Sequence, residues 1–163
     1  MGHTEQELDH IEIIKEYMLI TYDPKRAGAD AIRHLCAPRN RFIAPTTFPE
    51  IHTIEQYAEE HGKLMKQVND LRINNFDVLF AKDNRVCLRY SAEGSHNGEA
   101  HGEIQPTGRR ANWDAAAIFR LENGKIAEFI KEWNKLSMWK QLGWPPEECL
   151  VFANAELSAK KAA

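Results

Sequence analysis

The stretch RRANWDAAAIFRLENGKIAEFIKEWN, residues 109–134, decides the fold. Its Asn123-Gly124 pair is a strong signal for a tight hairpin, because both residues adopt positive φ at little cost. We predict one strand from about Arg109 to Leu121 and a second from Lys125 to about Asn134. The turn joins them as antiparallel neighbours.

Upstream of this hairpin, apolar residues recur at every second position, which is the period of a half-buried strand. Two series show the period: Phe76, Val78 and Phe80, and then Val86, Leu88, Tyr90 and Ala92, with a turn at 82–84 between them. The sequence therefore predicts four main strands in an antiparallel meander.

Helical patterns precede the strands. Thr4 and Thr53 each begin a capping box, because Glu7 and Gln56 follow three residues later. They predict helices at about 4–22 and 53–69, and a shorter helix is expected at 29–36. Three prolines exclude regular helix from 37–51. A short C-terminal helix is predicted at 136–142, with Gly143 as its cap.

Three N-terminal helices followed by a meander indicate an α+β fold, in which the helices pack on one face of the sheet. The length of 163 residues suits a single domain, 1–163, with one core. We expect that core to span about 5–143 and the tail at 153–163 to be frayed.

Composition narrows the classes of function. The net charge is -3, whereas a nucleic-acid binder carries a concentrated basic face, so we expect no nucleic-acid partner. The sequence contains no run of 18 apolar residues, so we predict no membrane-spanning helix. Its N-terminus is polar and contains no apolar signal core. We therefore expect a cytoplasmic protein. The three cysteines are odd in number and form no C-x-x-C pair, which disfavours disulfides and structural zinc.

Four groups of residues, in this order and spacing, resemble the SnoaL-like polyketide cyclases, the ester-cyclase type within the NTF2-like superfamily. They are Gly94-Ser95-His96 with Gly98 and Gly102, Pro106-Thr107-Gly108-Arg109, Ile118-Phe119-Arg120 with Gly124-Lys125-Ile126, and Gln141-Leu142-Gly143. The resemblance covers about 5–143. It implies a cone-shaped α+β barrel, with a strongly curved sheet around helices, an internal cavity and a homodimer or larger assembly. It also implies aldol closure of a polyketide-like carbonyl substrate without a metal or organic cofactor.

The sequence departs from the family at the acid/base aspartate, which the resemblance places seven residues before Gln141. That position is Asn134, and an amide cannot exchange a proton usefully near pH 7. Glu132 lies two residues earlier and shares a strand face with Asn134. If this face lines the cavity, Glu132 is the catalytic base and Asn134 its neighbouring donor. If it faces solvent, Glu132 is a surface charge, as is Lys131 opposite.

Four further residues are candidates for substrate binding. Trp113 precedes the small run 115–117, which indicates either a flat cavity wall or a core tryptophan packed on a helix. His61 lies in an apolar helical stripe, where it is a core residue or lines the cavity and titrates near neutrality. Tyr17 places its hydroxyl in the cone or at the rim, and His96 lies near the cavity rim or holds its loop.

The residues His96, Glu99 and His101 have types that bind zinc or iron. A glycine-rich loop enforces no geometry on them, so we predict no metal site. Trp133, Trp139 and Trp144 leave a large apolar area near the C-terminal end, which we interpret in part as a subunit contact of a homodimer.

Two functions follow. The first is an enzyme that acts on a small carbonyl substrate by general acid/base catalysis, in an aldol cyclisation, isomerisation or lyase reaction. The second is a non-catalytic module that binds a small molecule and has kept the cone without the chemistry.

Overall fold

The computed structural model describes residues 2–149, and the tail predicted at 153–163 lies outside them. The elements are α1 (Glu5–Thr21), α2 (Ala29–Ile32), the 3-10 turn η1 (Arg33–Leu35), β1 (Cys36–Ile43), α3 (Ile54–Gln67), β2 (Arg72–Lys82), β3 (Arg85–Ser95), β4 (Arg110–Glu122), β5 (Lys125–Trp133), α4 (Lys135–Leu142) and α5 (Pro146–Cys149). Within the described residues, no helix is both long enough and apolar enough to cross a membrane.

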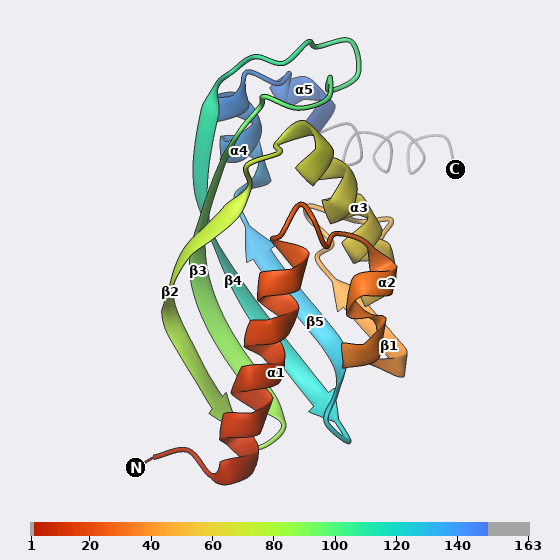
Figure 1. The fold of residues 1–163 in the computed structure, drawn as a ribbon, viewed down its shortest axis with the longest axis vertical. Coiled ribbons are helices and arrows are strands. Elements are labelled where there is room, and N and C mark those ends of the chain that lie inside the picture. Colours follow the sequence, from red (N-terminus) through yellow and green to blue (C-terminus); the bar gives the residue numbers. More distant parts are fainter. Residues whose placement is uncertain (1, 150–163) are drawn as a thin grey trace, which may run out of the picture.

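The strands form one curved sheet in the order β1-β5-β4-β3-β2 (Figure 1). The predicted meander is confirmed for β2 to β5, whose neighbours are all antiparallel. The prediction of four main strands was too low, because β1 adds a fifth strand that runs parallel to β5. Pro38 lies inside β1, where an edge strand tolerates the missing N–H.

Both predicted capping boxes are confirmed. The Thr4 hydroxyl accepts a hydrogen bond from the Glu7 N–H, and the Glu7 carboxylate accepts one from the Thr4 N–H. Thr53 and Gln56 repeat the arrangement at the start of α3. Glu7 also accepts from the Asp83 N–H at 2.9 Å, so the same carboxylate ties α1 to the β2–β3 turn.

The hairpin at Asn123-Gly124 is confirmed, with φ of 50° and 72° at its two residues. The inward face of β2 was predicted wrongly. Val78 and Phe80 are 41% and 47% exposed, because a register shift between Phe76 and Val78 reverses which residues face the core. A bulge of this kind moves every later side chain to the other face of the sheet.

The N-terminal helices lie on the concave face of the sheet (Figure 1). An aromatic cluster fills the space between these two layers. Tyr17 of α1 is at its centre, with its ring 5.6 Å from Phe119 and 5.7 Å from Phe129. It is fully buried and contributes nothing to the wall of the cavity described below. The Tyr17 hydroxyl was expected in the cone or at its rim, and the structure places the residue in the packing between α1 and the sheet.

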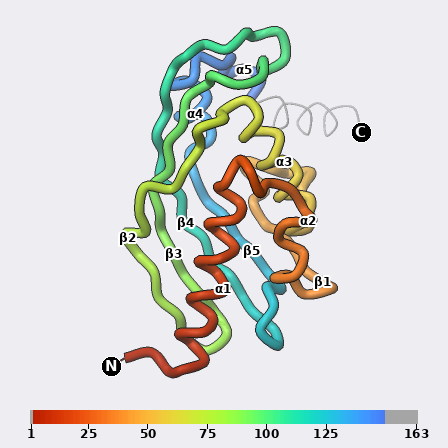
Figure 2. The backbone as a smooth tube through the Cα atoms, in the orientation of Figure 1, coloured from red at the N-terminus to blue at the C-terminus, as the bar shows by residue number. Residues whose placement is uncertain are grey.

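The connection between β3 and β4 arches over one end of the molecule, near α4 and α5 (Figure 2). It is fastened to the last turn of α3, since the N–H groups of Gly98 and Glu99 donate to the carbonyls of Gln67 and Lys66 at 2.9 and 2.8 Å. A side chain at position 98 would place its Cβ 2.0 Å from the Lys66 carbonyl oxygen. Glycine is required here because two backbones approach closely.

We expect Gly98→Ala to lower the free energy of unfolding by about 3 kcal/mol, because the loop must move off α3 to make room. The matched control is Gly102→Ala. Nothing lies within 4 Å of its Cβ and only its positive φ opposes the change, at a cost of about 1 kcal/mol. Urea denaturation measures both values, and equal losses would contradict the steric explanation.

Candidate functional site

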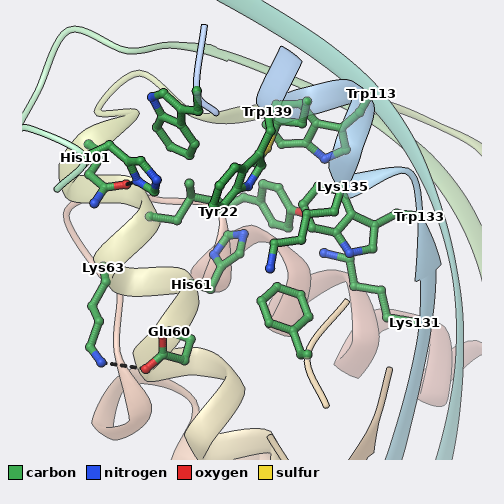
Figure 3. A pocket seen from close by; sticks show the side chains of 15 residues that line it. Tyr22, Glu60, His61, Lys63, His101, Trp113, Lys131, Trp133, Lys135 and Trp139 are labelled. Carbon is green, nitrogen blue, oxygen red and sulfur yellow. Dashed lines mark hydrogen bonds and ion pairs between the residues drawn. The ribbon is translucent and has the colours of Figure 1, made fainter. Parts of the chain in front are cut away.

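An apolar cavity of about 230 Å³ lies between the sheet, α3 and the C-terminal helices (Figure 3). Aromatic side chains supply much of its wall: Tyr22, Phe48, Trp113, Trp133, Trp139 and Trp144, with His61 and His101. Pockets for drug-sized ligands begin at about 300 Å³. The cavity therefore suits a small compound.

Strand β5 determines which charged groups enter this cavity. Lys131 and Trp133 line the cavity, whereas Glu132 between them is exposed. Successive side chains of a strand point to opposite faces, so Glu132 and Lys131 cannot share one. The prediction that Glu132 opens into the cavity was wrong, and the lysine assigned to solvent is the group that lines it.

Asn134 is also outside the cavity. It is the N-cap of α4, where its exposed side chain accepts a hydrogen bond from the Ser137 N–H at 2.9 Å. Asparagine is favoured at this position because it satisfies a free N–H of the first helical turn. The predicted catalytic partnership of Glu132 and Asn134 is therefore not supported by where they lie.

The Lys131 amine is the most unusual group of the site. Its side chain is 2% exposed, and Nζ donates a hydrogen bond to the Tyr57 hydroxyl at 2.7 Å. Nζ also lies 4.6 Å from the centre of the Trp133 ring. Burial, and then the positive charge of Lys135, lower the pKa of Lys131 to about 7. Near neutral pH the amine is thus divided between its charged and neutral forms.

Lys135 supplies a second amine at the start of α4. Nζ donates to the Thr47 carbonyl at 3.0 Å and lies 4.9 Å from the centre of the Phe48 ring. Burial lowers its pKa, although Cys149 and Glu60 act in the opposite direction. Figure 3 shows Lys131 and Lys135 reaching into the same space beside His61.

His61 lines the cavity, as one of the two predictions for it stated. Burial, and then the charge of Lys131, lower its pKa to about 3. It is therefore neutral near pH 7, and the expectation that it titrates near neutrality was wrong. Its ring lies 4.6 Å from that of Tyr22, whose hydroxyl shares a 2.7 Å hydrogen bond with Tyr90.

The tyrosines of this network keep their protons. Burial raises the pKa of Tyr22, Tyr57 and Tyr90 well above the ordinary value. Each hydroxyl is therefore a hydrogen-bond donor at any pH near neutrality, and Tyr57 places one directly beside the Lys131 amine.

Trp113 lines the cavity, as the first prediction for it stated. The indole N–H groups of Trp113 and Trp133 are buried and have no hydrogen-bond partner among residues 2–149. A buried donor without a partner costs roughly 1–3 kcal/mol.

His96 holds its loop and does not line the cavity. It is fully buried, Nε2 lies 2.9 Å from the Glu99 carbonyl, and Nδ1 accepts from the Trp144 indole at 3.1 Å. Of the two places predicted for His96, the structure therefore shows the one in which it holds its loop. His101, in the same loop, does line the cavity and stacks on Trp144 with ring centres 3.9 Å apart.

The C-terminal tryptophans lie around the cavity. Trp133, Trp139 and Trp144 all line the cavity, and Trp144 is almost fully buried. The three tryptophans are turned toward one another and toward the cavity (Figure 3). Their apolar surface forms part of the cavity wall, and the interpretation of part of this area as a subunit contact stays a prediction.

A model of the SnoaL-like polyketide cyclase family matches residues 22–142 of this chain. The chain belongs to that family. The matched segment contains every residue of the cavity wall except Trp144.

Solved structures agree with this SnoaL-like assignment at the level of fold. One from Jannaschia sp. CCS1, assigned to the SnoaL-like polyketide cyclases, superposes with a TM-score of 0.72 at 17% identity, over 90% of this chain and 99% of the other. IdmH from Streptomyces antibioticus, assigned as a polyketide cyclase, has a TM-score of 0.66 at 20% identity, over 82% and 98%. An LEH-like epoxide hydrolase from M. tuberculosis superposes with a TM-score of 0.60 at 11% identity, over 84% of this chain and 91% of the other. Comparison with curated protein sequences gives no match. The chain thus has the NTF2-like fold of a SnoaL-like protein.

Sequence reasoning missed four groups of this SnoaL-like site: Tyr22, Tyr57, Lys131 and Lys135. One signal for Lys131 was present, because Phe129, Lys131 and Trp133 share a strand face and two of the three are aromatic. A lysine flanked in this way has its amine among apolar groups. Lys135 gave no such signal, since its burial arises from the packing of α4 against distant residues.

We expect Lys131→Met to make this SnoaL-like protein more stable at pH 7 and to flatten the dependence of stability on pH. The pKa of Lys131 is lowered from 10.5 to about 7, so the unfolded chain binds more protons than the folded chain between these values. The free energy of unfolding of the wild type therefore rises with pH between pH 7 and 10.5, by about 5 kcal/mol once the whole range has been crossed.

Urea denaturation at several pH values from 6 to 10 measures this slope. Lys63→Met is the matched control, because Lys63 is exposed and paired with Glu60. Identical slopes in wild type and Lys131→Met would show that the Lys131 amine is not held in a medium that disfavours its charge.

Proposed function

We propose that the cavity is the active site of an enzyme that acts on a small carbonyl compound by general acid/base catalysis, with its own side chains as acid and base. The observation that carries the proposal is the Lys131 amine, buried beside the Tyr57 hydroxyl at 2.7 Å and facing an apolar cavity. A general base is most effective when its pKa lies near the working pH, and that of Lys131 is about 7.

In this mechanism, neutral Lys131 takes the proton next to the substrate carbonyl, and the charge passes to the carbonyl oxygen as an enolate. The ammonium of Lys135, the second amine of the cavity wall, stabilises that negative charge. The ammonium form of Lys131 then returns a proton to the product. Aldol cyclisation, isomerisation and lyase reactions all begin with this step.

The replacement of the family's aspartate by Asn134 is compatible with such chemistry. Position 134 is committed to capping α4, and the base comes from the inward-facing position three residues earlier. The only carboxylate in the cavity wall as the structure describes it, Glu60, is paired with Lys63 at 2.5 Å. The amine is therefore the better candidate for the base.

A second candidate function is a non-catalytic small-molecule binder. It is favoured by the aromatic wall of the cavity, which explains binding of an apolar ligand without any reaction. The two functions differ in one observable. The enzyme exchanges or moves a substrate proton, and the binder returns its ligand unchanged.

We expect the protein to catalyse exchange of the α-protons of 1-indanone with D2O, followed by NMR. The rate should rise with pH and level off above pH 7, as Lys131 loses its proton. Lys131→Met should lower the rate at least about 100-fold, the usual contribution of a general base. Tyr57→Phe should lower it less.

The matched control is Glu132→Gln on the opposite face of β5, which should leave the rate and its pH profile unchanged. Loss of exchange in the Glu132→Gln variant would show that Glu132, and not Lys131, is the general base. Tight binding of 1-indanone with no exchange above the buffer rate would favour the binder.

We also propose that the protein forms a homodimer through the open face of the sheet. An apolar row crosses this face on neighbouring strands, in register: Phe80, Cys87, Ile118 and Ile130. Phe80 and Ile118 are 47% and 40% exposed, and all four side chains point away from the helices. An apolar row of this kind is typical of a surface that a second subunit covers.

We expect the wild type to sediment at twice the mass of the 18.7 kDa chain, and Phe80→Arg with Ile118→Arg to sediment as a monomer. Leu19→Arg is the control, because Leu19 is equally exposed but lies on α1. Sedimentation velocity decides the matter, and a dimer that survives the double substitution would place the contact elsewhere.

A further inference from the structure

The Lys131 amine has the surroundings of a nucleophile as well as those of a base. It lies in the cavity wall, it is nearly inaccessible to bulk water, and none of the described residues pairs a carboxylate with it. Among residues 2–149, the Tyr57 hydroxyl is the one group that accepts a hydrogen bond from it. A lysine that is desolvated next to another cation is the kind that forms Schiff bases with carbonyl compounds.

We propose that Lys131 condenses with an aldehyde or ketone bound in the cavity to form a reversible imine. This step deepens the proposed function, since it uses the same cavity and the same amine. When a proton adds to its nitrogen, the imine becomes an iminium, which withdraws electrons from the neighbouring carbon more strongly than a carbonyl does and so makes the α-proton easier to remove.

The condensation balances without any further reactant. The Nζ lone pair forms a bond to the carbonyl carbon, and the carbonyl oxygen becomes a hydroxyl by taking a proton. A second proton converts that hydroxyl into water, which leaves as the carbon–nitrogen double bond forms. Nζ releases its protons in the course of the reaction, and the Tyr57 hydroxyl, 2.7 Å away, is placed to relay them. Hydrolysis reverses the sequence.

The charges around Nζ keep part of the amine neutral near pH 7. Lys135 faces it from the start of α4, and its positive charge disfavours a second one. Helix α3 contributes Tyr57, neutral His61 and Glu60, whose carboxylate is paired with Lys63. The end of α1 contributes the protonated hydroxyl of Tyr22. No free carboxylate in this described set holds Nζ in its charged form.

The test is reductive trapping. Wild-type protein is incubated at pH 7 with benzaldehyde and sodium cyanoborohydride, which reduces an iminium to a stable amine, and the adducts are located by peptide mass spectrometry. We expect one adduct at Lys131 that forms at least about 100-fold faster than at exposed Lys140, because an ordinary lysine is almost wholly charged at this pH.

Two variants sharpen the test. Lys131→Met should lose the fast adduct, and the mapping of the wild-type protein stands even if that variant folds poorly. Lys135→Met should retain the adduct but move the midpoint of its pH dependence upward, because the neighbouring positive charge is removed. A purely structural role for Lys135 would leave the midpoint where it is.

Adducts spread evenly over exposed lysines, or no adduct at Lys131 in benzaldehyde-treated protein, would overturn the imine. The outcome is separable from that of the proposed function. If 1-indanone exchange depends on Lys131 but nothing is trapped there, Lys131 acts only as a base. If trapping succeeds and no exchange is found, the imine stands and the proposed acid/base reaction falls.

Discussion

The contact between the Lys131 amine and the Tyr57 hydroxyl joins β5 to α3 at the centre of the molecule, and the properties of the site depend on it. A lysine without a carboxylate partner is unfavourable in an apolar interior when it is charged. The surrounding packing offsets this cost. Stacked pairs such as Phe42 with Tyr57 and Phe119 with Phe129, each 4.3 Å between ring centres, contribute about 0.5–1.5 kcal/mol each beyond the area they bury.

The same packing explains how the site differs from the pattern that the family suggests. A carboxylate and an amine reach a pKa near neutrality from opposite sides, because burial raises the pKa of the first and lowers that of the second. An aromatic cavity therefore accommodates either group as a base. In this chain the strand places the amine inside and leaves the end of β5 free to begin α4.

Much of the fold could be predicted from the sequence, because its signals are local. The capping boxes at Thr4 and Thr53 and the turn at Asn123-Gly124 are each decided by residues within four positions. Strand β1 was missed because its partner β5 is far away in the sequence: Arg41 pairs with Glu128, 87 residues later. The exposed side of β2 was missed because a bulge leaves no mark in the alternation of residue types.

The site was less accessible to sequence reasoning for a related reason. Trp113 and His61 could be found because each differs from its neighbours in the sequence: Trp113 precedes a run of small residues, and His61 lies in an apolar helical stripe. Lys131 is a charged residue, and its burial follows from the register of β4 with β5. Asn134 attracted attention through a resemblance, and its role as an N-cap depends on where one element ends and the next begins. The burial of Lys131 and the capping role of Asn134 both depend on how neighbouring elements are arranged, so neither can be predicted from a single position in the sequence.

The proline in β1 has a consequence for how the molecules behave when crowded. A sheet edge with free N–H and C=O groups can recruit a strand from another chain and grow into fibres. Here Pro38 has no N–H to offer, the ladder with β5 is interrupted between Cys36 and Arg41, and the Phe42 N–H is already occupied by the His52 carbonyl at 2.8 Å. The β1 edge of the sheet therefore cannot easily pair with a strand of another molecule through backbone hydrogen bonds.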